Sequence, residues 1–146
     1  MKVIRRCMCE DYPALVAIWE RSVRASHDFL DDDSIEEIKD ALIPDYFPNV
    51  ELYALSDNDS LVGFIGLHGN MIEMLFIDSE ARERGYGSAL IAFAFDKGAT
   101  RVDVNEQNPS ALAFYRAKGF KIIGRDATDD AGRPFPILHL ATAPMP

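Results

Sequence analysis

Several features are scarce in these 146 residues, and each scarcity excludes a class of protein. Cysteine occurs only at Cys7 and Cys9, too few for a disulfide framework, and no further cysteine or nearby histidine completes a metal-binding pattern. No apolar run is long enough to span a bilayer, and residues 1–6 lack the apolar core of a signal peptide. We therefore expect a cytoplasmic protein with reduced cysteines, no metal and no membrane association.

Positive charge is also in short supply. Fifteen lysines and arginines stand against 24 acidic residues, which gives a formal net charge of −9 and argues against nucleic acid as a general partner. An acidic surface suits a cationic substrate such as an amine, but it also serves solubility alone. The length suits one domain over residues 1–146, with enough chain to bury a core.

Hydrophobic periodicity and capping residues predict alternating strands and helices. Asp11 is the expected cap of a first helix, and Ser34 with Glu37 fits a capping box for a second. Residues 51–78 predict three strands in an antiparallel meander, followed by a third helix. A strand at Arg101–Asn105 should lie parallel to its predecessor, because a helix connects the two. The predicted order is β-α-α-β-β-β-α-β-α-β-β. The first helix should bury a stripe formed by Leu15, Ile18, Trp19, Ser22 and Val23.

One stretch in the middle of the chain has the composition of an anion-binding loop. Residues 82–88 follow a buried strand and open a helix, where unpaired backbone N–H groups and the helix dipole attract an anion. Gly85 and Gly87 carry no side chain to keep a ligand away, and Arg82 and Arg84 add positive charge. The pattern is neither a P-loop nor a dinucleotide fingerprint, because no Gly-Lys-Ser/Thr follows and the third glycine is missing. The loop therefore predicts a phosphate or pyrophosphate ligand, and the alternative is a glycine-containing turn into an ordinary helix.

The arginine and two glycines of this loop resemble the pyrophosphate loop of the GCN5-related N-acetyltransferase (GNAT) superfamily, which binds acetyl-coenzyme A (acetyl-CoA). The stretches at 27–30 and 105–108 are further similar to YjaB-like bacterial acetyltransferases. The resemblance implies the GNAT fold, an α/β (α+β) fold. Its central sheet is mixed and mostly antiparallel, with splayed strands 4 and 5 and flanking helices. The second motif of the family matches Asn108, Ala111, Tyr115, Gly119 and Phe120.

The same resemblance implies an acetyl-CoA site between the splayed strands, with no metal. The loop would bind the pyrophosphate mainly through backbone N–H groups, and the fourth strand would offer backbone groups to the pantetheine and the acetyl carbonyl. Carried over position by position, the cofactor-binding residues are Leu75, Phe76, Ile77, Arg82, Glu83, Arg84, Gly85, Tyr86, Gly87, Ser88, Asn105, Asn108 and Tyr115.

The implied chemistry is direct transfer of the acetyl group from acetyl-CoA to a primary amine of a small molecule, peptide or protein. Tyr115 is the expected general acid near the thioester sulfur, and the alternative is a tyrosine that only packs its helix against the sheet. Glu73 is one candidate base, because strand alternation places it on the face of Leu75 and Ile77, but it also fits a solvated carboxylate. His27 is another, at the end of the first helix, although a lone histidine is more often structural.

Several questions stay open at this stage. Asp103 and Asn105, at the cleft end of the fifth strand, either contact substrate or cofactor or only fix the next loop. His139 is expected to point outward from the last strand. An acyl-CoA-binding sensor without catalysis is the alternative to an enzyme, and Tyr115 favours the enzyme because a pure binder needs no leaving-group acid. The acceptor, the acyl-chain length and the choice between monomer and homodimer are not decided.

Overall fold

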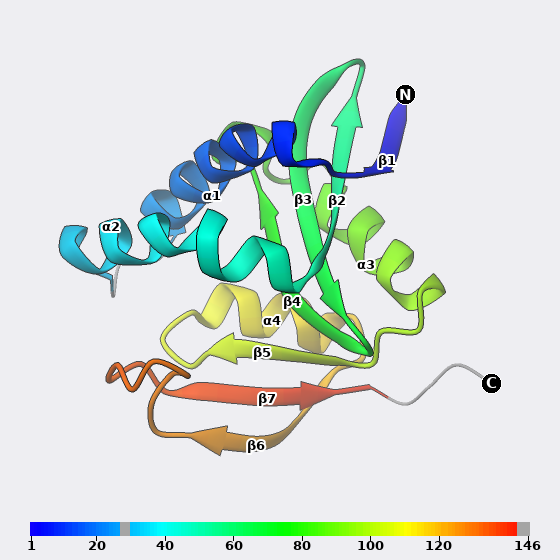
Figure 1. Cartoon of the computed structure of the whole chain (residues 1–146). Helices are drawn as coiled ribbons and strands as arrows, with labels where there is room; N and C mark the ends of the chain where they lie inside the picture. Colours follow the sequence, from blue (N-terminus) through cyan, green and yellow to red (C-terminus); the bar gives the residue numbers. More distant parts are fainter. Residues whose placement is uncertain (27–29, 143–146) are drawn as a thin grey trace.

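Figure 1 shows one mixed sheet with helices on both of its faces. The structure is a computed structural model, and it describes residues 1–26 and 30–142. The strands run in the order β1-β2-β3-β4-β5-β7-β6 across the sheet. Their bounds are β1 Lys2–Arg6, β2 Glu51–Asp57, β3 Ser60–His68, β4 Met71–Ile77, β5 Arg101–Asn105, β6 Lys121–Asp126 and β7 Ile137–Ala141. The helices are α1 Tyr12–Ser26, α2 Asp32–Ala41, α3 Tyr86–Asp96 and α4 Pro109–Ala117, with short helical turns at Cys9–Asp11, Leu42–Tyr46, Phe47–Asn49 and Ser79–Ala81.

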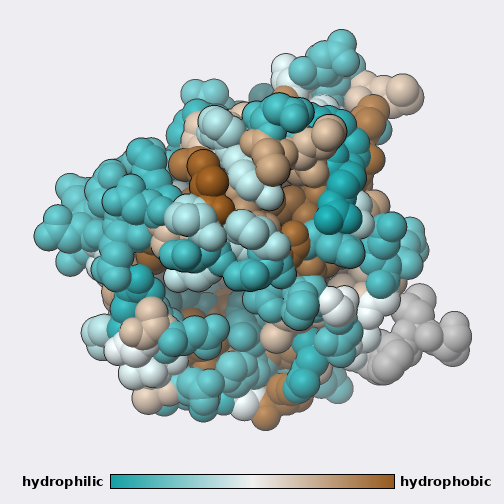
Figure 2. Space-filling view, viewed as in Figure 1, coloured by the Kyte–Doolittle hydropathy of each residue, from teal (hydrophilic) through white to brown (hydrophobic). Residues whose placement is uncertain are grey.

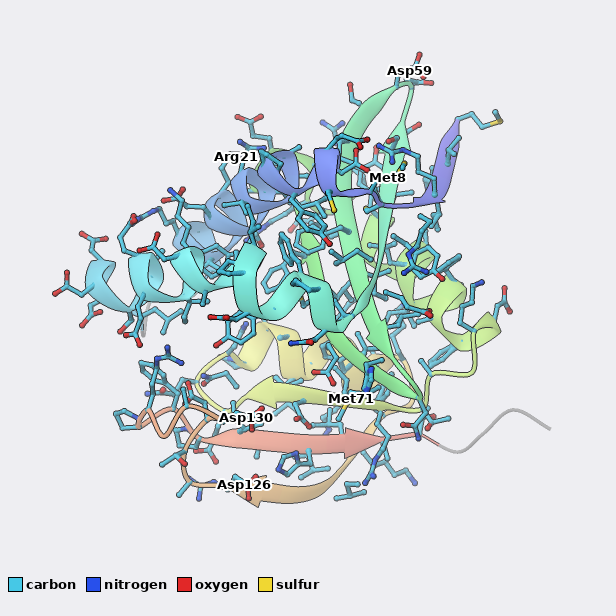
Figure 3. All side chains as sticks on the ribbon, in the orientation of Figure 1. Met8, Arg21, Asp59, Met71, Asp126 and Asp130 are labelled. Carbon is cyan, nitrogen blue, oxygen red and sulfur yellow. The ribbon has the colours of Figure 1, made fainter. Side chains whose placement is uncertain are left out.

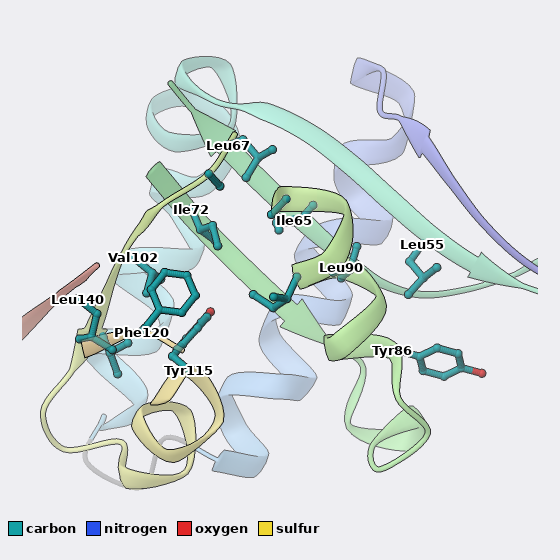
Figure 4. Close-up of a cluster of buried hydrophobic side chains, with 14 of the residues drawn as sticks. Leu55, Ile65, Leu67, Ile72, Tyr86, Leu90, Val102, Tyr115, Phe120 and Leu140 are labelled. Carbon is teal, nitrogen blue, oxygen red and sulfur yellow. The ribbon is translucent and has the colours of Figure 1, made fainter. Parts of the chain in front are cut away.

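The sheet separates two apolar cores, one under each helical layer. α1 and α2 cover one face, where the stripe predicted for α1 is buried and packs with Phe47 and Phe64. α3 and α4 cover the other face, and Figure 4 shows Leu90 of α3 and Tyr115 of α4 among the buried side chains there. Among the described helices, none combines the length and the apolar character needed to cross a membrane.

The middle of the sheet opens between β4 and β5. These two strands run parallel, as predicted, but their pairing is limited to Met71 with Arg101 and Ile72 with Val102. Beyond these pairs the strands diverge, as Figure 1 shows. Residues 74–77 of β4 therefore pair with β3 on one side and leave backbone groups available on the other. The predicted splay of strands 4 and 5 is confirmed.

Two predicted helix caps are wrong. Asp31, rather than Ser34, caps α2, because its carboxylate accepts the Ser34 backbone N–H at 2.7 Å and the helix begins earlier, at Asp32. Asp11 precedes α1, but its carboxylate accepts hydrogen bonds from the Arg5 guanidinium at 2.9 Å and from the Met8 backbone N–H at 2.8 Å. The Asp11 carboxylate is therefore bound by the Arg5 guanidinium and by the turn that precedes α1, and it does not cap the helix.

The prediction that strand alternation places Glu73 on the same face as Leu75 and Ile77 is also wrong. Gly66 of β3 pairs with Met74 and Leu67 pairs with Ile72, so Glu73 is an extra residue that forms a β-bulge. Simple alternation breaks at this point. As a result Ile72, Leu75 and Ile77 pack together on the α3 and α4 face, and Glu73 is exposed at the bulge.

Candidate active site

A cavity of about 330 Å³ lies where β4 and β5 separate. Its walls come from β4, β5, α4 and the end of α1, and they bring together residues far apart in the sequence. Two serines of α1 and Asp103 of β5 also reach it. The predicted site residues that line it are Glu73, Leu75, Phe76, Ile77, Arg82, Gly87, Asn105, Asn108 and Tyr115.

The remaining residues of the predicted anion loop adjoin this cavity without forming its wall. Glu83 and Gly85 adopt left-handed backbone conformations, with φ of 63° and 80°, which turn the chain into α3. The Tyr86 side chain leaves the site altogether: its hydroxyl donates to Asp57 at 2.7 Å, and Figure 4 shows it away from the other labelled side chains. Arg84 and Ser88 are exposed beside the loop. Only the backbone of Tyr86 can therefore take part in the predicted site.

The start of α3 has the features of an anion site. Its N-cap is Gly85 and no side chain caps it, whereas side chains cap α2 and α4, so the first-turn N–H groups are left for a ligand. A Cβ on Gly87 would stand 3.2 Å from the Phe114 ring, so the glycine permits close packing. Positive charge lies nearby, because Lys118 donates to the Ser88 hydroxyl at 2.6 Å.

Tyr115 presents its hydroxyl to the cavity. The residue is 7% exposed, and its ring makes edge contacts with Phe114 and Phe120 at centroid distances of 5.2 and 5.6 Å. Figure 4 shows the ring extending from α4 with its hydroxyl toward β4. Within the described part of the chain, the hydroxyl makes no hydrogen bond. Burial raises the pKa of Tyr115 well above its ordinary value, so the phenol stays protonated and can donate.

Two asparagines shape the loop between β5 and α4. The Asn108 side chain accepts the Ala111 backbone N–H at 3.2 Å, which confirms it as the N-cap of α4. The Asn105 side chain accepts the Gln107 backbone N–H at 2.9 Å. Both amide oxygens therefore hold the loop, and both side chains also face the cavity.

A second cavity, of about 550 Å³, lies on the α1 and α2 side of the sheet. It shares Glu73, Met74 and Phe76 with the first, so both cavities border the same stretch of β4 at the bulge. Partial loss of hydration raises the pKa of Glu73, the negative charge of Asp103 adds to this, and His68 opposes it. The other walls of this cavity are Trp19, Leu42, Tyr46, Asn49, Val50, His68 and Asp130.

Of the three histidines, the structure describes His68 and His139. His27 lies outside the described residues, although Ser26 before it lines the first cavity. His68 lines the second cavity. His139 alternates along β7 with the buried Leu138 and Leu140, so its side chain points away from the core, as predicted. It is half-buried and lies between Asp103 and Asp126, with ring nitrogens 2.7 and 2.9 Å from their carboxylates.

Known proteins share this arrangement. A family model described as the acetyltransferase (GNAT) domain matches residues 20–136. The chain belongs to the GNAT acetyltransferase family. It is 43% identical over 140 residues to the peptidyl-lysine N-acetyltransferase YjaB of Salmonella typhimurium, covering 94% of this chain and 95% of that protein. The solution structure of apo-form YjaB from Escherichia coli matches with a TM-score of 0.89 and 39% identity over 99% of each chain.

A more distant GNAT structure shares the fold alone. The PaiA N-acetyltransferase of Thermoplasma acidophilum, solved in complex with coenzyme A, matches with a TM-score of 0.71 and 20% identity over 95% of this chain and 98% of that one. Together these matches confirm the predicted family, its YjaB-like subgroup and the α+β fold. The protein is an acyltransferase, an N-acetyltransferase of the GNAT type.

Some residues of this GNAT site were missed from the sequence. Lys118 ends the helix that carries the second motif, but nothing in the sequence indicates that it reaches Ser88 in another helix. Ser22 was predicted only as a buried position of α1, yet its carbonyl accepts the Arg82 guanidinium at 3.2 Å and it lines the cavity. Both contacts depend on how distant elements pack, which local patterns do not encode.

Proposed function

We propose that this GNAT enzyme transfers the acetyl group of acetyl-CoA directly to the side-chain amine of a lysine in a peptide or protein. Tyr115 serves as the general acid and Glu73 as the general base. The observation that carries the proposal is that two cavities share wall residues, Glu73 among them, at the β4 bulge. Direct transfer requires donor and acceptor to be bound together in reacting geometry, and two cavities that share the Glu73 wall can hold them next to one another.

The first cavity suits the donor. The uncapped start of α3 offers N–H groups and a positive dipole end to the pyrophosphate, with Gly87 allowing close approach. The free edge of residues 73–77 can pair with the amides of the pantetheine arm, much as an added strand would. The fold relative from Thermoplasma acidophilum was solved with coenzyme A, which supports the same class of ligand here.

The residues around the opening supply each proton transfer. Glu73 takes a proton from the lysine ammonium, and the free amine forms a C–N bond with the thioester carbonyl carbon. A backbone N–H on the free edge of β4 hydrogen-bonds the resulting oxyanion. As the C–S bond breaks, Tyr115 donates its proton to the leaving thiolate. The phenol is restored by the second proton released from the attacking nitrogen.

The second cavity suits a lysine side chain. Trp19, Leu42 and Val50 give it apolar walls that can cover a chain of methylene groups, while Glu73 at the shared end can accept the ammonium. Asp130 adds a carboxylate to the lining, and Figure 3 places it beside the lower strands. Figure 2 shows hydrophilic residues over much of this face of the molecule, as expected for a surface that meets a polar partner. The name of the relative YjaB as a peptidyl-lysine N-acetyltransferase supports the same acceptor class.

A peptide assay tests this acceptor. An N-terminally blocked peptide with one lysine is incubated with the enzyme and acetyl-CoA, alongside the same peptide with arginine in its place and a free polyamine. We expect mass spectrometry to find one acetyl group on the lysine peptide and none on the arginine peptide. Transfer to the polyamine alone would contradict the lysine acceptor, and no transfer to any amine would contradict the reaction itself.

A further inference from the structure

The His139 side chain on β7 bridges two carboxylates, one from each neighbouring strand. Its Nδ1 lies 2.7 Å from Asp103 of β5, and its Nε2 lies 2.9 Å from Asp126 of β6. Carboxylates accept hydrogen bonds, so both ring nitrogens can donate at once only when the imidazole is protonated. These two bonds raise the pKa of His139 above its ordinary value. Protonation therefore gives an imidazolium shared by two carboxylates, and the bridge favours that form.

Asp103 belongs both to this bridge and to the active-site cavity. Ile72 of β4 pairs with Val102 of β5, so Glu73 and Asp103 are the first positions beyond the last pair, where the strands begin to separate. Both residues line the donor cavity. Partial loss of hydration is the largest cause of the raised pKa of Glu73; the charges of Asp103 and Asp130 raise it further, while His68 lowers it. His139 thus acts on a carboxylate that lines the same cavity as the proposed base.

We propose that His139 is a positioning residue for acetyl transfer: its bridge holds Asp103 beside Glu73 and offsets the charge of Asp103, so that Glu73 stays ionised and able to accept a proton. This rests on the proposed function, in which Glu73 is the general base. Without the imidazolium, the charge of Asp103 would act on Glu73 without compensation and keep it protonated to higher pH. Without the Asp103 charge, Glu73 would ionise at lower pH.

A bridge with a merely structural role would behave differently. It would tie the edge strand β6 to β7 and β5, and its loss would lower the unfolding temperature without changing the ionisation of Glu73. Opposite shifts from removing His139 and removing Asp103 are therefore the signature of the electrostatic role, because both changes break the same bridge but alter the local charge in opposite directions.

NMR titration of the full chain measures this ionisation directly. The side-chain carboxyl carbons of glutamate are labelled with ¹³C, and the Glu73 signal is assigned by its absence in Glu73→Gln. We expect the Glu73 midpoint to rise by roughly half a pH unit or more in His139→Gln and to fall by a similar amount in Asp103→Asn. Asp126→Asn is the matched control, because Asp126 meets the far side of the imidazole, and it should shift the midpoint least. Unfolding temperatures establish that each variant is folded.

Kinetic measurements then distinguish the effect of His139 on Glu73 from the role of Glu73 as the general base. The acid limb of kcat/KM against pH, measured with the lysine peptide, should move in the same order as the NMR midpoints. Midpoints that stay unchanged in folded His139→Gln and Asp103→Asn overturn the role of His139. Midpoints that shift as expected while the acid limb does not follow uphold the coupling and overturn Glu73 as the base. If His139→Gln fails to fold, the difference between Asp103→Asn and Asp126→Asn decides the question in the same way.

Discussion

The hydroxyl of Tyr115 can be removed without disturbing the packing of its ring. Its contacts with Phe114 and Phe120 involve only the ring, so phenylalanine preserves them. We expect Tyr115→Phe to bind acetyl-CoA as the parent does, while turnover falls by about one order of magnitude or more because the leaving thiolate loses its proton donor. Calorimetry and steady-state kinetics on the same samples measure the two effects.

Tyr53→Phe is the matched control for this change. Tyr53 lies on β2, where its hydroxyl is hydrogen-bonded to Glu51 at 3.4 Å, and it lines neither cavity. Its turnover should equal that of the parent. If Tyr115→Phe and Tyr53→Phe turn over equally fast, Tyr115 has no part in the chemistry.

Glu73→Gln keeps the size of the side chain and removes its charge. Because partial loss of hydration raises the pKa of Glu73, the folded state holds this proton more tightly than the unfolded chain does. The protonated carboxyl therefore favours folding at acid pH, and that contribution is lost as the pH rises through the folded-state pKa. At pH 7 we expect Glu73→Gln to unfold at an equal or higher temperature, while turnover falls and the acid limb of the pH profile disappears. A lower unfolding temperature together with normal turnover would mean that the carboxylate stabilises the fold and does not catalyse.

At the scale of elements, the start of α3 carries the donor site. Gly87→Asp places a carboxylate among the first-turn N–H groups and against the Phe114 ring. We expect acetyl-CoA binding to be abolished, because the new charge repels the pyrophosphate. Gly98→Asp, just beyond the other end of α3, is the control: its added Cβ has no neighbour within 4 Å, so stability falls through its left-handed φ of 89° but binding should remain. Retained affinity in Gly87→Asp would overturn the assignment of this helix start.

The element scale also shows what sequence could and could not predict. The strand order along the chain, the Asn108 cap and the parallel pairing of β4 with β5 followed from local patterns and the family resemblance. The bulge at Glu73 did not, because it exists only in the pairing of β4 with β3. The Asp31 cap was missed because three consecutive aspartates offer several caps, and local sequence does not choose among them.

Across the whole molecule, the features that sequence missed are long-range. The bridge through His139 depends on β7 lying between β5 and β6, and the closeness of Asp103 to Glu73 depends on where two strands stop pairing. The second cavity, which shares part of its wall with the first, likewise forms only where α1, the segment after α2 and β4 come together. Candidate site residues can be identified from the sequence, but which of them interact depends on how the strands pair in the sheet.

Binding of the donor is the most direct test of the account. Calorimetric titration of the whole protein with acetyl-CoA, with coenzyme A and NADH as comparisons, should show one site for acetyl-CoA, binding of coenzyme A at the same site and no binding of NADH. A protein that binds neither acetyl-CoA nor coenzyme A would contradict the donor site at the opening of β4 and β5, and the proposed transfer to lysine would fall with it.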